Sequence, residues 1–320
     1  MTYSPPFFLF NGHLETIYPA LFRKIRPLAY QHERITTPDE DFLDLYWLTQ
    51  NSGKLVILSH GLEGNALRPY MNGMARACYQ HGFDVLAWNF RGCGDEMNKQ
   101  LRFYHSGATD DLELVIQHAL KKAYREINLI GFSLGGNLTL KYLGESQPVH
   151  HLIHRAVTFS VPLDLLTSCH KISAPANRLY AYRFLRSLKN KVMRKAQQMK
   201  VIRTDGLETI RTLMEFDDRY TAPLHGFENA EHYYKMCSAI NYVQNIRVPT
   251  LIINAKNDPF LSIDCFPEKL LENHAHVKFA CTEKGGHVGF SQFDKNGLYW
   301  SEERAVEFLA GSYTQNRGTK

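Results

Sequence analysis

Short apolar runs alternate with longer amphipathic stretches along most of this 320-residue chain. The runs are rich in β-branched residues, which is typical of strands, whereas the stretches between them repeat their apolar residues at helical spacing. This pattern predicts strands at 41–48, 54–59, 82–89, 127–130, 155–160, 249–254 and 277–281. It predicts helices at 68–79, from 109 to about 125, and at 137–144.

The alternation of strands and helices predicts an α/β fold, with a mostly parallel central sheet and helices on both faces. Ligands of such sheets bind beyond the carboxyl ends of the strands. We therefore expect functional side chains in the loops that follow the strands.

One such loop contains the pentapeptide Gly-Phe-Ser-Leu-Gly at 131–135. It lies between a predicted strand and a predicted helix, which is the context of a nucleophile elbow. A serine hydroxyl reacts only when a base takes its proton, and a sharp turn holds it where a histidine can reach it. Ser133 is therefore the candidate nucleophile.

The elbow pattern requires an acid and then a histidine farther along the chain, each after a strand. Asp258 follows the strand at 249–254 and precedes a proline, which favours an extended backbone. His287 lies in a glycine-flanked turn after the strand at 277–281. An isolated aspartate is also a common turn former. In this order, however, the positions predict a triad of Ser133, Asp258 and His287.

Acyl transfer also needs hydrogen-bond donors for the oxyanion of the tetrahedral intermediate. The backbone N–H of Leu134, which follows the candidate serine, is one predicted donor. The second is expected in the loop after the strand at 54–59, and we assign it to Leu62. In the other interpretation of this loop, Glu63 is solvated and the loop only ends a strand. His60 fits support of the loop better than proton transfer.

The composition agrees with a globular protein, with 44% hydrophobic and 22% charged residues. The chain contains no run of eighteen apolar residues, so no membrane span is predicted. The first residues lack the basic and apolar regions of a secretory signal. The six cysteines show no C-x-x-C spacing. Reduced thiols in a cytoplasmic protein are the expectation.

More residues separate the strands at 155–160 and 249–254 than a crossover needs. We predict a mobile helical cap at 163–239, inserted into a core of 1–162 and 240–320. The cap is expected to select the acyl chain through apolar residues such as Met193 and Met214. These ranges divide the chain into a hydrolytic core and a substrate-selecting insertion.

The cap contains ten Lys or Arg residues and no Asp or Glu between 171 and 203, and the net charge of the chain is +5. A solvated outer face is the favoured interpretation of this segment. The alternative is a weak peripheral contact of 171–203 with an anionic membrane surface. The sequence contains no motif of a nucleic-acid-binding fold that would explain the positive charge, so no nucleic acid is expected as a partner.

Eight short motifs occur in a characteristic order along nearly the whole chain, at 11–16, 60–64, 89–93, 104–107, 131–137, 215–218, 257–260 and 285–290. This set resembles the YheT-like branch of the α/β-hydrolase superfamily, serine carboxylesterases related to eukaryotic lipid esterases and acyl-ester synthases. The resemblance implies an α/β-hydrolase fold and carboxylic ester hydrolysis without a metal or organic cofactor. The family's nucleophile, acid and base correspond to Ser133, Asp258 and His287.

These observations predict a carboxylic ester hydrolase that acts through an acyl-enzyme on small-molecule esters with short- to medium-chain acyl groups, or on lipid-like esters. Two alternatives stay open. The same triad could transfer the acyl group to an alcohol, or the fold could be a non-catalytic binding module. Spacing alone assigns no role to the motifs at 11–16 and 104–107.

Overall fold

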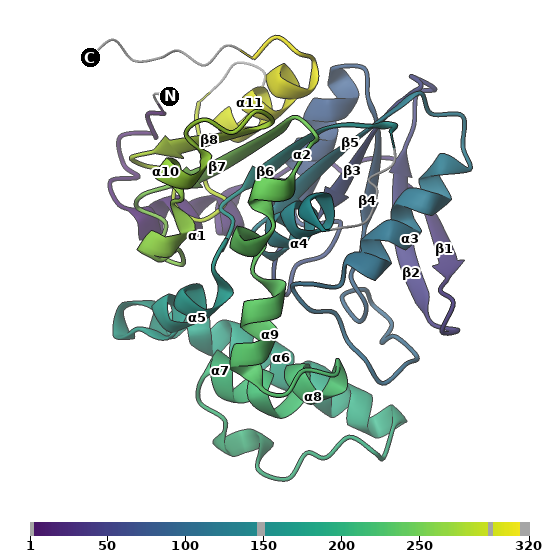
Figure 1. The fold of residues 1–320 in the computed structure, drawn as a ribbon, viewed down its shortest axis with the longest axis vertical. Helices are drawn as coiled ribbons and strands as arrows, with labels where there is room; N and C mark the ends of the chain where they lie inside the picture. Colours follow the sequence, from purple (N-terminus) through teal and green to yellow (C-terminus); the bar gives the residue numbers. More distant parts are fainter. Residues whose placement is uncertain (1–2, 146–150, 294–296, 314–320) are drawn as a thin grey trace.

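A computed structural model describes residues 3–145, 151–293 and 297–313. The protein is built around an eight-stranded sheet with the order β1-β2-β4-β3-β5-β6-β7-β8 (Figure 1). β2 pairs antiparallel with β1 and β4, and the other neighbours are parallel. The strands are β1 Gln31–Thr36, β2 Phe42–Leu48, β3 Lys54–Ser59, β4 Asp84–Trp88, β5 Glu126–Phe132, β6 Ile153–Phe159, β7 Thr250–Ala255 and β8 Val277–Thr282.

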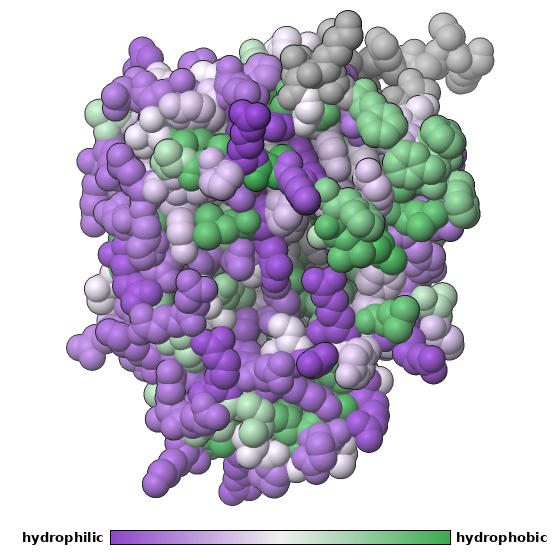
Figure 2. All heavy atoms as spheres, turned by 180° about the vertical axis from the view of Figure 1, so that it is seen from behind, coloured by the Kyte–Doolittle hydropathy of each residue, from purple (hydrophilic) through white to green (hydrophobic). Residues whose placement is uncertain are grey.

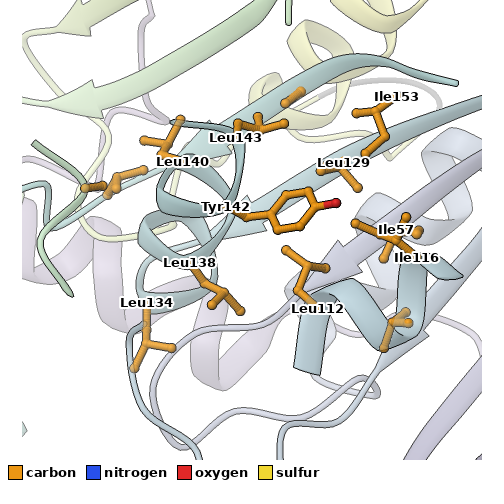
Figure 3. Close-up of a cluster of buried hydrophobic side chains, with 14 of the residues drawn as sticks. Ile57, Leu112, Ile116, Leu129, Leu134, Leu138, Leu140, Tyr142, Leu143 and Ile153 are labelled. Carbon is orange, nitrogen blue, oxygen red and sulfur yellow. The ribbon is translucent and has the colours of Figure 1, made fainter. Parts of the chain in front are cut away.

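Helices cover both faces of the sheet, and each face has its own apolar core. Helices α3 (Thr109–Leu120) and α4 (Leu134–Gly144) pack on one face, where Leu112 of α3 lies near Tyr142 of α4 (Figure 3). Helices α2 (Pro69–Gln80) and α11 (Trp300–Leu309) contribute to the core on the other face. Burial of both faces explains why the central strands are nearly continuous apolar runs.

A helical insertion between β6 and β7 lies beyond one end of the sheet (Figure 1). A buried apolar cluster, which includes Leu185, Val192, Phe216 and Tyr220, holds its helices together. The helices of the insertion are α5 Leu165–Ser173, α6 Arg178–Gln198, α7 Leu213–Phe216, α8 Ala222–Leu224 and α9 Ala230–Cys237, with a π-helical turn at Asp217–Thr221 and 3-10 turns at Pro175–Asn177 and Leu207–Thr209.

The remaining short elements connect the layers. Helix α1 is Gly12–Phe22, helix α10 is Glu268–Leu271, and 3-10 turns are found at Ala239–Asn241, Val243–Asn245 and Ile263–Cys265. Within the described part of the chain, no helix has the length and apolar character needed to cross a bilayer.

The predicted fold class is confirmed: a mostly parallel sheet with helices on both faces and a helical insertion. The ranges 1–162, 163–239 and 240–320 stay a prediction as domain boundaries. The two core ranges include residues 1–2, 146–150, 294–296 and 314–320, which lie outside the described residues.

One prediction about a single element is wrong, and one strand was not predicted. The helix that begins at Thr109 ends at Leu120 rather than near 125, because the chain must turn to enter β5. The N–H of Arg125 already donates to the carbonyl of Gly53 at 2.9 Å, next to the pairing of β5 with β3. The apolar pattern of β1 does not predict a strand, because β1 lies at the edge of the sheet and has no buried residue.

Candidate active site

Ser133 occupies a strained turn between β5 and α4. Its φ of 52° and ψ of −120° place a non-glycine residue in a sparsely populated region, as expected of a nucleophile elbow. The N–H of Ser133 donates to the carbonyl of Phe159 at 2.8 Å, which ties the turn to β6. A side chain at Gly135 would place its Cβ only 2.4 Å from the carbonyl oxygens of Ser59 and His60. Glycine therefore lets α4 approach β3 closely.

The three predicted side chains meet beyond the carboxyl ends of β5, β7 and β8. The Nε2 atom of His287 lies 2.9 Å from Oγ of Ser133, and its Nδ1 atom lies 2.8 Å from Oδ2 of Asp258. The side chain of Asp258 is fully buried, and that of His287 is 11% exposed. The other oxygen of Asp258 accepts the N–H of Phe260 at 2.8 Å, which fixes the carboxylate plane.

These contacts determine the tautomer of His287. An ionised carboxylate can only accept hydrogen bonds, so Nδ1 carries the proton and donates it to Asp258. In the neutral ring Nε2 is then free to accept from the Ser133 hydroxyl. The arrangement is that of a serine and a base within hydrogen-bond reach, with an acid that orients the base.

Helix α1 supports the loop of His287, which gives the motif at 11–16 a structural role. Glu15 is buried and accepts hydrogen bonds from the N–H of Gly285 and, at 3.1 Å, from the side-chain amide of Asn257. Burial raises the pKa of Glu15, although these hydrogen bonds oppose the increase. The Oγ1 atom of Thr16 accepts the N–H of His287 at 2.9 Å. Two side chains of α1 thus hold the backbone of this loop at His287 itself and two residues before it.

The start of α1 also packs directly on the loop of the acid. The side chain of Asn11 caps the helix by accepting the N–H of Leu14 at 2.9 Å. A Cβ atom on Gly12 would lie 1.9 Å from the carbonyl oxygen of Asn257, so only glycine allows this contact. The side chain of Asn257 in turn accepts the N–H of Gly286 at 3.0 Å. One helix therefore joins the loops of Asp258 and His287.

The two predicted oxyanion donors flank Ser133. Leu134 is the first residue of α4, where a backbone N–H has no acceptor within the helix. Leu62 lies in the loop after β3, and both leucines line the cavity at Ser133. The ring of His60 supports this loop: its Nδ1 atom lies 2.8 Å from the carbonyl of Gly61, and its Nε2 atom accepts the N–H of Phe90 at 3.1 Å. Burial lowers the pKa of His60 to about 3, so the ring is neutral.

Glu63, next to Leu62, is not solvated but belongs to a buried polar network. Its carboxylate accepts hydrogen bonds from Tyr104, at 2.7 Å, and from Ser187, and it forms an ion pair with Lys191 at 2.7 Å. Burial would raise the pKa of Glu63, but Lys191 and the hydroxyl donors together lower it. Ser187 and Lys191 belong to α6. The network therefore fastens the insertion to the loop that carries Leu62.

The motif at 104–107 makes a second link between the core and the insertion. The N–H of Ser106 donates to the hydroxyl of Tyr233 on α9 at 3.0 Å, and that hydroxyl donates to Oγ of Ser106 at 2.8 Å. Asn137 of α4 donates to the carbonyls of Ser106 at 3.0 Å and Cys237 at 2.8 Å. This motif, like that at 11–16, positions segments that are distant in the sequence.

Two cavities reach Ser133. The smaller, of about 100 Å³, is lined by insertion residues such as Ile172, Leu213, Asp217 and Tyr234, together with Leu134. The larger, of about 430 Å³, lies between α1, α6 and the loop after β3, and His287 is on its wall. Both cavities have a predominantly apolar lining, which is typical of small-molecule sites.

Large apolar side chains are exposed at the rim of the larger cavity. Ile17 and Leu21 of α1 are 38% and 62% exposed, and Leu179 of α6 is 80% exposed, and all three line this cavity. Figure 2 shows apolar side chains gathered on the side of the molecule where α1 lies. The expected role of Met193 is wrong, because this residue is 47% exposed and lines neither cavity. Met214 packs against the core of the insertion instead.

Within the described residues, no group of three or more His, Cys, Asp or Glu side chains is arranged to hold a metal ion. No sequence pattern predicts the supporting roles of Glu15, Thr16, Asn257 and Asn137. Glu15 and its partner Gly285 are 270 positions apart, so no local pattern could pair them. The position of Asn11 before a helical stretch was the one local signal, since asparagine is a preferred helix N-cap.

Comparisons with known proteins show the family to which this chain belongs. A family model described as "Hydrolase_4: Serine aminopeptidase, S33" matches residues 50–288. The chain is also 35% identical over 292 residues to YheT of Escherichia coli (strain K12), whose name assigns it provisionally to the esterases; the match covers 88% of this chain and 84% of that protein. The chain belongs to this family of α/β-hydrolases.

A further relative and a solved structure extend the similarity. A monoacylglycerol lipase of Saccharomyces cerevisiae is 28% identical, over 85% of this chain and 62% of the yeast protein. Among solved structures, an esterase of Pyrococcus furiosus superposes with a TM-score of 0.60 at 20% identity and covers 89% of this chain and 91% of its own. At this identity the structural match shows the shared fold.

Proposed function

We propose that this α/β-hydrolase is a serine carboxylic ester hydrolase. The observation that carries the proposal is the position of His287, with one ring nitrogen 2.9 Å from the Ser133 hydroxyl and the other 2.8 Å from the Asp258 carboxylate. The esterase and lipase names of its relatives support the same reaction class. We assign nucleophile, base and acid to Ser133, His287 and Asp258.

The reaction begins when Ser133 attacks the ester carbonyl and His287 takes its proton. Asp258 keeps the ring in the required tautomer and stabilises the imidazolium that forms. The amides of Leu62 and Leu134 donate to the oxyanion of the tetrahedral intermediate. The intermediate collapses when His287 gives the proton to the leaving alcohol, and Ser133 is left acylated.

Deacylation repeats these steps with water, which His287 activates, and releases the acid. An alcohol in place of water would form a new ester, so acyl transfer is the second candidate function. A relative from Saccharomyces cerevisiae favours it, since that protein is named a medium-chain fatty acid ethyl ester synthase/esterase; it is 29% identical over 80% of this chain and 61% of its own length.

In this proposal residues 163–239 act as the cap and the two flanking ranges as the hydrolytic core. The expected substrates are small-molecule esters, including lipid-like ones. Purified protein should hydrolyse at least one p-nitrophenyl ester from a series with acyl groups of two to twelve carbons, and a fluorophosphonate probe should label it. A protein that neither cleaves any of these esters nor reacts with the probe would instead be a non-catalytic binding module.

We also propose a weak peripheral contact of 171–203 with anionic lipid surfaces, as the alternative to a purely solvated face. Lys191 and Lys195 of this segment are buried, and Lys195 donates to Asn98 at 2.8 Å. Exposed cations such as Arg186 and Lys200 remain in this segment, which also carries the exposed apolar side chain of Leu179. Basic residues next to apolar ones suit a membrane interface.

Such a contact should depend on salt. Anionic vesicles should bind the protein at low ionic strength and release it near 0.1 M salt, where charges more than about 10 Å apart are largely screened. Co-sedimentation at two salt concentrations measures this, with neutral vesicles as the control. The double variant Arg186→Glu, Lys200→Glu should bind less at low salt. Equal and negligible binding at both concentrations would leave this segment as a solvated face.

A further inference from the structure

The two cavities meet at Ser133 but differ in their access to His287. The larger has both Ser133 and His287 on its wall. The smaller is lined by Ser133 and by Leu134, the residue after it, but His287 is not part of its lining. Leu62 borders both cavities. This position suits a donor to an oxyanion that forms where the two cavities meet.

The chemistry of ester cleavage distinguishes these two sides. A base that takes the serine proton must return it to the oxygen of the leaving alcohol, so that oxygen has to lie within reach of Nε2 of His287. The acyl chain, on the other side of the carbonyl carbon, makes no such demand. We propose that the smaller cavity binds the acyl group and the larger cavity binds the alcohol. This inference rests on the proposed esterase function.

The volume of the smaller cavity then limits the acyl chain. At about 100 Å³ it is smaller than the roughly 150 Å³ apolar cavity that accommodates benzene, a molecule of six carbons. The acyl group that fits without rearrangement therefore has on the order of five carbons. Helices α5, α7 and α9 and the π-helical turn form much of the wall, so the insertion determines the acyl length.

Polar groups in the wall also disfavour a long alkyl chain. Asp217, in the π-helical turn, accepts hydrogen bonds from the hydroxyls of Thr221 at 2.5 Å and Tyr234 at 2.6 Å, and it lines the smaller cavity. An alkyl chain pressed against this carboxyl would remove the remaining solvent from it without supplying a donor. A short acyl group leaves room for water beside Asp217.

The larger cavity suits a bulky, apolar alcohol. Its volume is about 430 Å³, and it is open toward the exposed apolar side chains of Ile17, Leu21 and Leu179. Phe184 and Phe260 add aromatic surface near His287. The substrate class assigned by this geometry is an ester of a short acid with a large, lipid-like alcohol.

A matrix of esters tests the assignment, with acyl groups of two to twelve carbons combined with small and large alcohols. Wild type should prefer short acyl groups on large alcohols. Ile172→Ala enlarges the smaller cavity and should raise kcat/KM for acyl groups one or two carbons longer by at least about tenfold relative to short ones, since one methylene in an apolar pocket is worth roughly 10–200-fold. Ile172→Phe should shift the preference the other way.

Ile17→Ala is the matched control, because it removes the same atoms from the wall of the larger cavity. It should change the dependence on the alcohol and leave the acyl-length ratio unaltered. The assignment is overturned if Ile17→Ala shifts the acyl ratio and the Ile172 variants shift the alcohol ratio, or if wild type prefers long acyl groups on small alcohols. If wild type shows neither ester turnover nor fluorophosphonate labelling, the esterase function itself is refuted, and the assignment of the two cavities with it.

Discussion

Replacement of Ser133 by alanine should lower ester turnover by about a millionfold, as loss of the nucleophile does in a well-studied serine hydrolase. The variant removes the only atom that Nε2 of His287 contacts in the triad, the hydroxyl oxygen at 2.9 Å. Without it no acyl-enzyme forms, and any residual rate comes from substrate binding and the oxyanion donors alone. Labelling by a fluorophosphonate should disappear as well.

A matched variant separates this effect from unfolding. Ser312→Ala removes the same group from an exposed position at the end of the chain's described part, and it should keep both turnover and labelling. Thermal melting of the two variants should resemble that of wild type. Continued labelling of a folded Ser133→Ala protein would show that another residue is the nucleophile.

Replacement of Asp258 by asparagine should lower turnover by up to about ten-thousandfold while labelling becomes slow rather than absent. The side chain of asparagine has nearly the same size as that of aspartate, but its amide can donate to Nδ1 of His287, which lies 2.8 Å from Oδ2 of Asp258. This hydrogen bond favours the ring tautomer in which Nε2 carries the proton. A protonated Nε2 cannot take the proton of Ser133. The predicted loss is therefore in the chemical step, and single-turnover kinetics with one ester would measure it.

Three other aspartates provide the comparison. Asp218 and Asp264 are exposed, and their asparagine variants should stay near wild type. Asp217 lines the smaller cavity, and burial raises its pKa to about 6 despite the opposing hydrogen bonds from Thr221 and Tyr234. Assays at pH 8 keep this carboxyl mostly ionised, so Asp217→Asn then tests loss of the charge, which should alter KM more than kcat. If Asp217→Asn or Asp218→Asn were as severe as Ser133→Ala, with Asp258→Asn near wild type, the acid would be misassigned.

The sequence by itself was sufficient for the features that depend on local pattern. Strands β3 to β7 follow from short apolar runs, because a strand that is largely buried on both faces has little choice of residues. The turn at Ser133 follows from glycines between a strand and a helix. The order of Ser133, Asp258 and His287, each after a strand, then placed the three side chains at one edge of a parallel sheet.

Local pattern failed where exposure or turns decide the outcome. Strand β1 has a polar sequence and lies at the edge of the sheet, so it lacks an apolar signature. Helix α3 ends earlier than the sequence predicts, because helix propensity does not include the hydrogen bond of Arg125 to Gly53 that begins the next strand. Met193 is of a residue type that is common in apolar pockets, but it is exposed to solvent.

Only the tertiary structure decided which distant groups serve the site. Glu15 and Thr16, near the start of the sequence, accept hydrogen bonds from the loop of His287. Lys191, one of the basic residues of α6, forms a buried ion pair with Glu63. The division of the space at Ser133 into a small and a large cavity is likewise tertiary. Hydrophobic periodicity and turn propensity act between neighbouring residues, whereas buried charges and cavity walls depend on side chains that meet only after the sheet and the insertion have packed together.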